Sequence, residues 1–266
     1  MMKHEKKPLL SIITVCYNEE KTIKKTCDSV CNQIFRDFEW IVVDGKSTDK
    51  TVEIIDRYKT DILISEDNDG VYDAMNKGIK KSRGKYLLFL NGGDYLMNKN
   101  VLQEVSILIK QDNKSNDIYY GDLEYGNGDI VTFVKSILDK KFFITKTISH
   151  QATFIKKRLF EEYGRYDEKY KISADFDFWI KTIIVGNVKT KYLPVIVSVF
   201  DLKGISTNSK LAKKQINERN SILLSYNLIN KYQVGLARMK STLLMVLKRL
   251  GLYNYIRRIY RSVVKR

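Results

Sequence analysis

The chain has 266 residues, enough for one sizeable core and an appendage, and its 44% hydrophobic and 29% charged residues are typical of a folded protein rather than a disordered one. No apolar run approaches the roughly 18 residues that span a bilayer, and no signal peptide is evident, so we expect an intracellular protein. The net charge of +16 is strongly basic, and three cysteines are an odd number that argues against a disulfide framework and for reduced thiols.

Strands and helices are predicted to alternate through the first 95 residues. Runs of apolar and β-branched residues predict four buried strands, at residues 9–16, 38–44, 62–65 and 86–90. Helical spacing of apolar residues predicts three helices, at residues 19–33, from a cap at 48 or 49 to about 58, and at 71–82. This order is typical of an α/β fold with a mainly parallel sheet and helices on both faces.

Polar residues follow each of the four predicted strands. The segments are Tyr17-Asn18-Glu19, Asp44-Gly45, Glu66-Asp67-Asn68-Asp69 and Asn91-Gly92-Gly93-Asp94. Any one of them alone is explained equally well as a turn or a helix cap. Because ligands of such sheets bind beyond the carboxyl ends of the strands, four polar strand ends at one edge favour a binding cleft.

The usual phosphate-binding loops are missing from this sequence. No G-x-G-x-x-G follows the first strand, and no G-x-x-x-x-G-K-[ST] occurs. A nucleoside diphosphate in the cleft would therefore need another partner for its charge, and a divalent cation held by a strand-end carboxylate would provide it. Asp94 is the candidate ligand, and the two glycines before it would let a diphosphate approach the backbone closely.

Four segments of the chain together resemble a known family. They read SIITVCYNEEKTI, WIVVDGKSTDKT, SEDNDGVYDAMNKGIKKSRGKYLLFLNGGDYL and ISADFDFWIK, and they follow one another over roughly residues 9 to 200. They resemble the family 2 glycosyltransferases of the GT-A fold, above all the bacterial branch that assembles capsule, O-antigen and exopolysaccharide repeat units. The resemblance implies a catalytic domain of residues 1–218, with a Rossmann-like nucleotide-sugar-binding part at about 9–95 and an acceptor-binding half at about 96–210.

The resemblance assigns roles to matching positions. The residues implied to bind a nucleotide-sugar are Val15, Tyr17, Asn18, Glu19, Asp44, Asn68, Asp69, Asn76, Lys77, Asn91, Gly92 and Gly93. Asp94 corresponds to the last acid of the family's Asp-x-Asp-like motif, which binds the Mn²⁺ or Mg²⁺ that bridges the diphosphate. Two positions depart from the family: Gly93 stands where a second acid is common, and Met75 stands where many relatives have Arg, a charge that Lys77 is hypothesised to supply.

Asp175 is the expected catalytic residue, because its segment resembles the family's acidic pair at the start of a helix facing the acceptor. In an inverting transfer, a carboxylate takes the proton of the attacking acceptor hydroxyl while the cation stabilises the departing diphosphate. The alternative is that Asp175 and Asp177 only favour the positive end of a helix dipole. Asp177 is expected to be a supporting residue on the acceptor side. His150 is predicted to open a short strand, either as a hydrogen-bonded structural residue or as an acceptor contact or additional metal ligand.

The excess of positive charge lies mainly in residues 219–266. This segment contains eleven Lys and Arg and no Asp or Glu. Apolar residues recur at helical spacing over 236–250 and 252–263, which predicts basic amphipathic helices that lie on an anionic membrane surface. An apolar stripe packed on the protein's own core, or a homodimer contact, remains an alternative. Nucleic acid is not expected as a partner, because the segment carries no recognised nucleic-acid-binding motif.

We therefore expect a metal-dependent, inverting glycosyltransferase, cytoplasmic and peripheral at the inner face of the cell membrane. Its donor would be a nucleoside-diphosphate sugar, and its acceptor a lipid-linked or polysaccharide-precursor glycan in the synthesis of the bacterial surface. One alternative is a non-catalytic relative that binds nucleotide or glycan, which Gly93 motivates. The other is a sugar nucleotidyltransferase, although such enzymes have a Gly-rich first loop where this chain has Tyr17-Asn18-Glu19.

Overall fold

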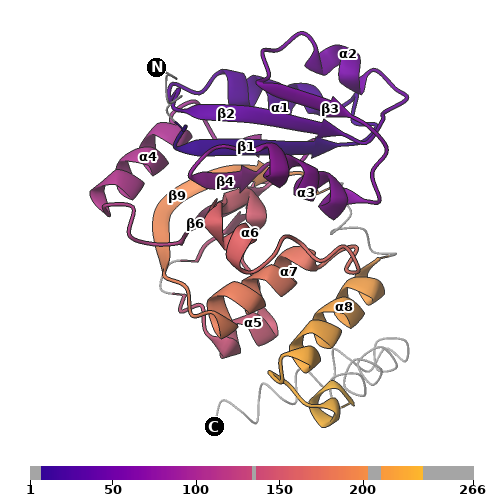
Figure 1. Cartoon of the computed structure of the whole chain (residues 1–266), viewed down its shortest axis with the longest axis vertical. Coiled ribbons are helices and arrows are strands. Elements are labelled where there is room, and N and C mark those ends of the chain that lie inside the picture. Colours follow the sequence, from indigo (N-terminus) through magenta and orange to yellow (C-terminus); the bar gives the residue numbers. More distant parts are fainter. Residues whose placement is uncertain (1–6, 134–135, 203–210, 236–266) are drawn as a thin grey trace, which may run out of the picture. The chain divides into compact units, whose positions relative to one another are not determined.

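The computed structural model describes residues 7–133, 136–202 and 211–235 of the chain (Figure 1). The chain forms two compact units, Met1–Arg219 and Asn220–Arg266. In the second unit the described residues, 220–235, contain the end of one helix and a short helical turn. The predicted amphipathic helices of residues 236–263 lie outside the described residues.

The first half of the sheet is parallel, as predicted. Its strands are β1 (Leu10–Cys16), β2 (Phe38–Asp44), β3 (Ile62–Ser65) and β4 (Tyr86–Phe89). They lie in the order β3-β2-β1-β4, and every neighbouring pair is parallel. The helices between them are α1 (Ile23–Cys31), α2 (Thr51–Ile55) and α3 (Val71–Lys81). Cys16 is paired with Asp44, and Asp44 with Ser65, so the carboxyl ends of three strands lie level at one edge.

Two of the three helices in this half are shorter than predicted. α1 begins at Ile23 instead of Glu19, because the amide of Glu19 donates to Thr51 Oγ1 at 2.7 Å and Asn18 has a φ of +53°, outside the helical region. α2 ends at Ile55 instead of about residue 58, and its cap residue is Lys50. Asp49 still accepts a hydrogen bond from the amide of Thr51 at 2.9 Å. The helices are placed correctly by apolar spacing, but hydrogen bonds between neighbouring loops shorten them.

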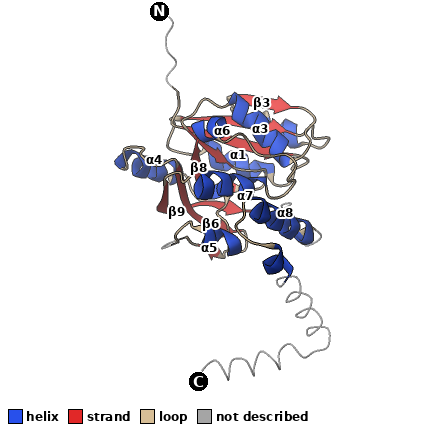
Figure 2. Ribbon diagram, turned by 60° about the horizontal axis from the view of Figure 1, so that its bottom comes forward, coloured by secondary structure: helices blue, strands red, loops and turns tan. Residues whose placement is uncertain are grey.

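Helices cover both faces of the parallel strands (Figure 2). Successive residues of a strand point to opposite faces, and β1 shows the consequence. Ile12 belongs to the core cluster that includes Ile23, Cys27 and Val30 of α1. Ile13 faces α3, where a Cβ added at Gly78 would lie 2.5 Å from Ile13 Cγ2, so only glycine allows this close helix–sheet contact. The buried strands thus lie between two helical layers.

The second half continues the same sheet with mixed pairing. Its strands are β5 (Tyr95–Leu96), β6 (Ile118–Tyr125), β7 (Ile130–Val131), β8 (Thr153–Lys156) and β9 (Thr190–Phe200). The order continues from β4 as β8-β6-β9-β5, with β7 beside β6, and only the β6–β9 pair is parallel. The helices are α4 (Val101–Gln111), α5 (Lys140–Thr145), η1 (His150–Ala152), α6 (Arg158–Glu162), α7 (Ala174–Trp179), the π-helix η2 (Ile180–Val185) and α8 (Ala212–Ser225).

A cluster of aromatic rings supports α7 on the face of the sheet opposite α1. Phe89 at the end of β4 contacts Phe160 and Tyr166, with ring centroids 5.9 and 5.4 Å apart. Phe160 stacks on Phe178 of α7 at 4.4 Å, and Tyr166 meets Phe178 edge-on at 5.6 Å. Such aromatic pairs add about 0.5–1.5 kcal/mol each beyond the area they bury. The cluster therefore fixes the helix that carries Asp175 to the centre of the sheet.

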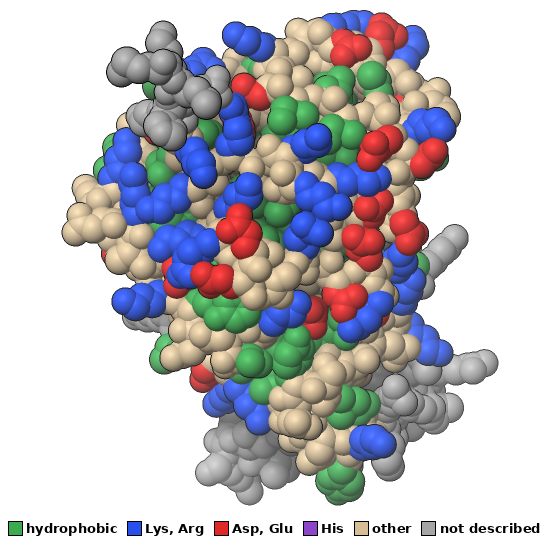
Figure 3. All heavy atoms as spheres, in the orientation of Figure 1, with side chains coloured by type: hydrophobic (Ala, Val, Ile, Leu, Met, Phe, Trp, Pro, Cys, Tyr) green, Lys and Arg blue, Asp and Glu red, His purple; other side chains and the backbone are tan. Residues whose placement is uncertain are grey.

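No helix among the described residues is long and apolar enough to cross a membrane. Lysine and arginine side chains are spread over the face drawn in Figure 3, while acidic side chains gather toward one side of it.

Candidate active site

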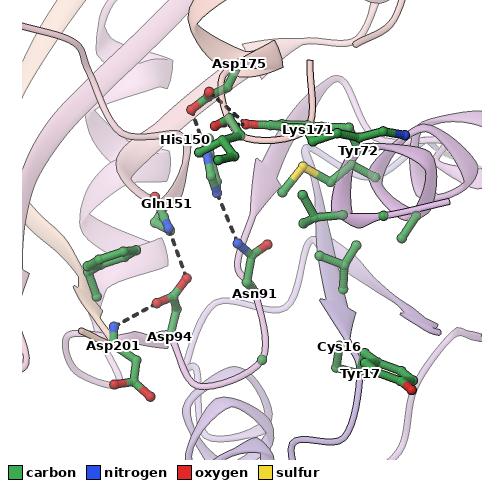
Figure 4. A pocket seen from close by; sticks show the side chains of 18 of the residues that line it. Cys16, Tyr17, Tyr72, Asn91, Asp94, His150, Gln151, Lys171, Asp175 and Asp201 are labelled. Carbon is green, nitrogen blue, oxygen red and sulfur yellow. Dashed lines mark hydrogen bonds and ion pairs between the residues drawn. The ribbon is translucent and has the colours of Figure 1, made fainter. Parts of the chain in front are cut away.

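A cavity of about 1170 Å³ opens where the polar strand ends meet the second half of the sheet. It is lined from one side by the ends of β1 and β4 and the loops after β2 and β3, and from the other by the ends of β6 and β9, residues 147–151 and the start of α7. The predicted site residues that line it are Val15, Tyr17, Glu19, Asn68, Asn91, Gly92, Asp94, His150 and Asp175. Figure 4 shows several of them around one space. The structure thus brings together predicted residues as far apart in the sequence as Val15 and Asp175, which are 160 positions apart (175 − 15).

The other predicted site residues do not line the cavity: Asn18, Asp44, Asp69, Asn76, Lys77, Gly93 and Asp177. Asp44 is fully buried, and its carboxylate accepts hydrogen bonds from the Ser47 amide at 2.9 Å, the Ser65 hydroxyl at 2.7 Å and the Ser47 hydroxyl. The side-chain Oδ1 of Asn18 accepts from the backbone amide of Thr48 at 2.9 Å, and the backbone N–H of Asn18 donates to Ser47 Oγ at 2.8 Å. Asn18 thus ties the loop after β1 to the loop after β2, and Asp44 ties the loop after β2 to the end of β3.

The other predicted residues that do not line the cavity also form hydrogen bonds or ion pairs within the protein. The ammonium of Lys77 pairs with Glu66 at 3.0 Å and Asp73 at 3.1 Å and donates to Asn68 Oδ1 at 2.7 Å. The positive charge of Lys77, hypothesised to replace the family's arginine, is therefore paired within the protein. Its ammonium holds Asn68, which does line the cavity. Asp69 pairs with Lys171 at 2.9 Å, and the Asn76 amide donates to the carbonyl of Tyr166 at 2.9 Å. Asp177 is buried and lies 3.6 Å from Lys181, on a part of α7 that does not line the cavity.

Asp94 is almost completely buried at one end of the cavity, with 3% of its surface exposed. Its Oδ1 accepts from the backbone amide of Asp201 at 2.9 Å, and its Oδ2 accepts from Nε2 of Gln151 at 3.1 Å. Among the described residues it has no Lys or Arg partner. Burial raises the pKa of this carboxyl to about 7. A cation bound beside this carboxyl would favour its charged form and lower the pKa.

Asp201 is a site residue that the sequence reasoning missed. It follows β9 directly, and it lines the cavity beside Asp94. Gly93 has a φ of +96°, and a Cβ added there would lie 3.0 Å from Oδ2 of Asp201. The carboxylate of Asp201 therefore occupies the space that a side chain at position 93 would need. The signal in the sequence was an acid at a strand end, the same pattern as in the first half, but the strand itself was not predicted.

The donor set at this end fits a divalent cation. Mg²⁺ and its relatives are usually held by one or two carboxylates together with substrate phosphates and water. Asp94 and Asp201 would provide two carboxylates at the wall of a cavity large enough for a nucleotide. Within the described ranges, no group of three or more His, Cys, Asp or Glu side chains could hold a metal by itself. The remaining ligands would then come from the substrate and from water.

Asp175 lies on the other side of the cavity, in the first turn of α7. Its Oδ1 accepts from the hydroxyl of Tyr72 at 2.9 Å and from the amide of Phe176 at 2.8 Å. Its Oδ2 lies 3.1 Å from Nδ1 of His150. Burial raises the pKa of Tyr72 well above the ordinary value, so its hydroxyl stays a hydrogen-bond donor. Asp175 does lie near the positive end of a helix, but its carboxylate is also bound by the side chains of Tyr72 and His150, from two other elements, and it lines the cavity, which a simple dipole role does not require.

The prediction that His150 opens a strand is wrong. His150 begins the short turn η1, and β8 starts only at Thr153, because the amide of Ala152 donates back to the carbonyl of Ser149 at 3.1 Å. The loop before α7 is fixed by Glu218 of α8, whose carboxylate accepts from the amides of Lys171, Ile172 and Ser173 at 2.9–3.1 Å. This contact was also missed, since nothing in the sequence spacing links residues 45 positions apart.

Part of the cavity wall is apolar. The apolar and aromatic residues from the second half of the fold that line it include Leu123, Tyr125, Ile148, Phe176 and Phe200. The guanidinium of Arg219 lies 4.4 Å from the centre of the Phe176 ring and donates to the carbonyl of Lys146 at 2.9 Å. Burial lowers the pKa of this guanidinium from its ordinary value, although Asp175 opposes the effect. This side therefore combines apolar surface with one half-buried cation.

The fold is an α/β fold with a cavity at the carboxyl ends of its parallel strands, and comparison with known proteins gives the family. Residues 11–167 match the family model described as Glycosyl transferase family 2. The chain is 33% identical over 212 residues to a PGL/p-HBAD biosynthesis glycosyltransferase of Mycobacterium tuberculosis, covering 78% of this chain and 82% of that one. It is 32% identical over 199 residues to an uncharacterized glycosyltransferase of Rickettsia typhi, covering 71% and 63%. The chain belongs to glycosyl transferase family 2, and the predicted family is confirmed.

Solved structures share the fold at lower identity. TarS of S. aureus superposes with a TM-score of 0.62 at 24% identity, over 72% of this chain and 36% of that one, so this chain spans little more than a third of its length. TarS 1-349 in complex with UDP-GlcNAc gives a TM-score of 0.62 at 22% identity, over 75% and 60%. The mannosyltransferase PcManGT from Pyrobaculum calidifontis, in complex with GDP-Man and Mn²⁺, gives 0.57 at 14% identity, over 98% and 87%. The predicted α/β fold of the GT-A type is confirmed.

Proposed function

We propose that this glycosyltransferase is an inverting enzyme that uses a nucleoside-diphosphate sugar, with Asp94 and Asp201 as ligands of a divalent cation and Asp175 as general base. The observation that carries the proposal is the placement of two carboxylates, Asp94 and Asp175, in the wall of one cavity, the first held by a backbone amide and Gln151 and the second by Tyr72, His150 and a backbone amide. In an inverting transfer the hydroxyl attacks from the face opposite the departing diphosphate. The enzyme therefore needs one group near the hydroxyl to take its proton and another near the diphosphate to hold a cation.

The donor side supports a nucleotide ligand. Tyr17 is 60% exposed although it is aromatic, and a Cβ added at Gly45 would lie 3.2 Å from its ring. An exposed ring at the edge of a cavity provides a surface on which a nucleobase can stack. The UDP-GlcNAc of the TarS complex and the GDP-Man and Mn²⁺ of the PcManGT complex support the same class of donor and cofactor here.

The chemistry follows from the residues of this chain. Asp94 and Asp201 would hold Mn²⁺ or Mg²⁺, which when bound neutralises charge on the departing diphosphate. Asp175 would accept the proton of the acceptor hydroxyl while that oxygen attacks the anomeric carbon from the face opposite the diphosphate. The apolar residues of the cavity wall, such as Leu123, Ile148 and Phe200, would exclude water from the cavity. The acceptor hydroxyl would then compete against fewer water molecules.

The acceptor is proposed to be a lipid-linked or polysaccharide-precursor glycan of the bacterial surface, reached at the inner face of the membrane. Three observations support this: the apolar residues that line the cavity, the eleven positive charges of residues 219–266, and the role of a relative in PGL/p-HBAD biosynthesis. Anionic lipid attracts nearby Lys and Arg by roughly 1 kcal/mol each. The enzyme would then be a peripheral membrane protein of the cytoplasmic side.

Titration calorimetry tests the donor site. UDP, GDP and dTDP are each titrated, with and without Mn²⁺, into wild type, Asp94→Asn and the control Asp122→Asn, which changes a buried carboxylate that does not line the cavity. We expect one nucleotide to bind only with Mn²⁺, Asp94→Asn to weaken it at least about 30-fold, and Asp122→Asn to leave it within about threefold. Equal binding without metal would remove the role of Asp94, and no binding of any nucleotide would refute the proposed function.

A further inference from the structure

Four side chains form a hydrogen-bonded chain across the cavity, and Figure 4 shows three of its members in line. Asn91 follows β4, His150 opens η1, Asp175 belongs to α7 and Tyr72 to α3. Nδ2 of Asn91 lies 3.3 Å from Nε2 of His150, Nδ1 of His150 lies 3.1 Å from Oδ2 of Asp175, and the Tyr72 hydroxyl lies 2.9 Å from Oδ1 of Asp175. The chain therefore joins a strand end on the donor side to the candidate base.

The contacts of His150 fix which of its ring nitrogens faces Asp175. Asp175 as a carboxylate only accepts hydrogen bonds, so Nδ1 of His150 must donate. Nε2 lies against the side-chain amide of Asn91, which holds the other edge of the ring. The ring also meets Phe89 edge-on, with centroids 6.5 Å apart and planes at 88°, and only 12% of its side chain is exposed. The imidazole is thus held in one orientation with Nδ1–H toward Asp175.

The hydrogen bonds of Asp175 leave one acceptor position open. A carboxylate has about four such positions, two on each oxygen. Oδ1 uses both of its positions, for Tyr72 and the amide of Phe176, while Oδ2 uses one, for His150. The side chain is 17% exposed and lines the cavity. One position on Oδ2 therefore remains for a hydroxyl that enters the cavity.

The residue after His150 holds the other carboxylate centre. Nε2 of Gln151 donates to Oδ2 of Asp94 at 3.1 Å, and Gln151 is 97% buried. The loop of Asp94 is in turn tied to Asn91, whose carbonyl accepts from the Asp94 amide at 3.0 Å. Two consecutive residues of η1 thus bind the two carboxylates, and Figure 4 shows both contacts. A rigid three-residue turn is a means of fixing the separation of the two centres.

We infer that η1 positions both centres of the reaction: His150 orients the carboxylate of Asp175 so that its open position faces the acceptor hydroxyl, and Gln151 orients Asp94. The inference rests on the proposed function, in which Asp175 is the base and Asp94 a metal ligand. His150 and Gln151 are positioning residues, because each acts through the carboxylate that it holds. The alternative is a buried histidine that only fills space beside Phe89.

Nitrogen-15 NMR of histidine tests the inference without any substrate. The chain has only two histidines, His4 and His150, so His150→Gln assigns the signals in the full-length protein. We expect His150 to carry hydrogen on Nδ1 at neutral pH, and Asp175→Asn to change its nitrogen shifts while those of His4 stay fixed. A signal pattern with hydrogen on Nε2 alone would overturn the inference, whatever the outcome of nucleotide binding.

Matched substitutions separate positioning from packing. Asn at position 150 places an amide nitrogen near the site of Nδ1, whereas Gln places one near the site of Nε2. We expect kcat for release of nucleoside diphosphate from the bound sugar nucleotide to be at least about tenfold lower in His150→Gln than in His150→Asn, with nucleotide affinity equal in both. Gln151→Leu should instead weaken Mn²⁺-dependent nucleotide binding, about fivefold or more. Equal kcat in the two His150 variants, or loss of nucleotide affinity in both, would mean a packing role and overturn the inference.

Discussion

The two sides of the cavity are built from polar residues in different ways. On the side of β1 to β4, the polar side chains at the strand ends mostly bond to one another, as Asp44 does with two serines and Lys77 with two carboxylates. On the side of β6 to β9, fewer polar groups face the cavity, and Asp175 and Arg219 reach it from segments far apart in the sequence. The first side is thus a wall held by its own hydrogen bonds, and the second side presents single groups, which the proposed function uses for chemistry.

Two buried carboxylates show the same difference in their pKa. Burial alone would raise the pKa of Glu39, but hydrogen bonds from Ser11, Arg83 and Gly84 outweigh it and lower the pKa below the ordinary value. Asp94 is equally buried and accepts only two hydrogen bonds, and its pKa is raised to about 7. Asp94 thus receives fewer hydrogen bonds from its own protein than Glu39 does, as the proposed role in holding a cation would require.

The largest expected effect is on the acceptor side, in a comparison of two acids of α7. Asp175→Asn should lower turnover by about 10³-fold, because the amide cannot take the acceptor proton. Asp177→Asn changes a buried acid two positions on that does not line the cavity, and it should lower turnover less than about threefold per folded molecule. Initial rates of nucleoside diphosphate release measure both, with circular dichroism as the check on folding. Similar losses in the two variants would mean that Asp175 acts through the stability of α7.

The next effect concerns the stability of the donor side. Glu39→Gln should lower the free energy of unfolding by about 2–4 kcal/mol at pH 7, since it breaks a buried charge-assisted network. Because the pKa of Glu39 is lowered in the folded state, its contribution is present above the unfolded pKa of about 4.3 and is lost as pH falls through the folded value. Urea unfolding from pH 7 to pH 3 should therefore show a shallower acid decline in the variant. An unchanged slope would contradict the assignment.

A smaller effect distinguishes strain from site geometry at Gly93. Gly93→Ala places a side chain at a φ of +96° and within 3.0 Å of Asp201, while the control Gly128→Ala has a φ of +89° and no atom within 4 Å. Both should lose about 1–2 kcal/mol of stability. Only Gly93→Ala should also weaken Mn²⁺-dependent nucleotide binding, about tenfold, because it displaces Asp201. Equal nucleotide affinity in the two variants would exclude Asp201 from the cation site.

The smallest effect is expected at Lys77. This ammonium does not line the cavity and holds Asn68 instead, so Lys77→Met should weaken nucleotide binding only about two- to fivefold. Calorimetry at two salt concentrations measures it. A loss above about 30-fold with a strong salt dependence would mean that Lys77 contacts the diphosphate directly, and the donor side would then be less preformed than we describe.

The sequence predicts the first half of the fold and much of its cavity wall. The four parallel strands follow from short runs of β-branched residues such as Ile12-Ile13 and Val42-Val43, and Asp94 follows from its place at a strand end. The contacts of the second half depend on pairing across the chain, so their geometry could not be predicted. Asp201 meets Asp94 over 107 positions, and Tyr72 meets Asp175 over 103, with no local pattern that marks either pair. Asp175 itself was recognised through the family resemblance rather than through local chemistry.

The measurement that tests the account most directly compares Asp94→Asn with Asp175→Asn in both binding and turnover. Nucleotide affinity is measured by calorimetry with Mn²⁺, and turnover as nucleoside diphosphate released from the sugar nucleotide that wild type binds. We predict that Asp175→Asn binds within about threefold of wild type while turnover falls about 10³-fold, and that Asp94→Asn loses both. Loss of nucleotide binding in Asp175→Asn, or normal turnover in Asp94→Asn, would contradict the division of the cavity into a binding side and a chemical side.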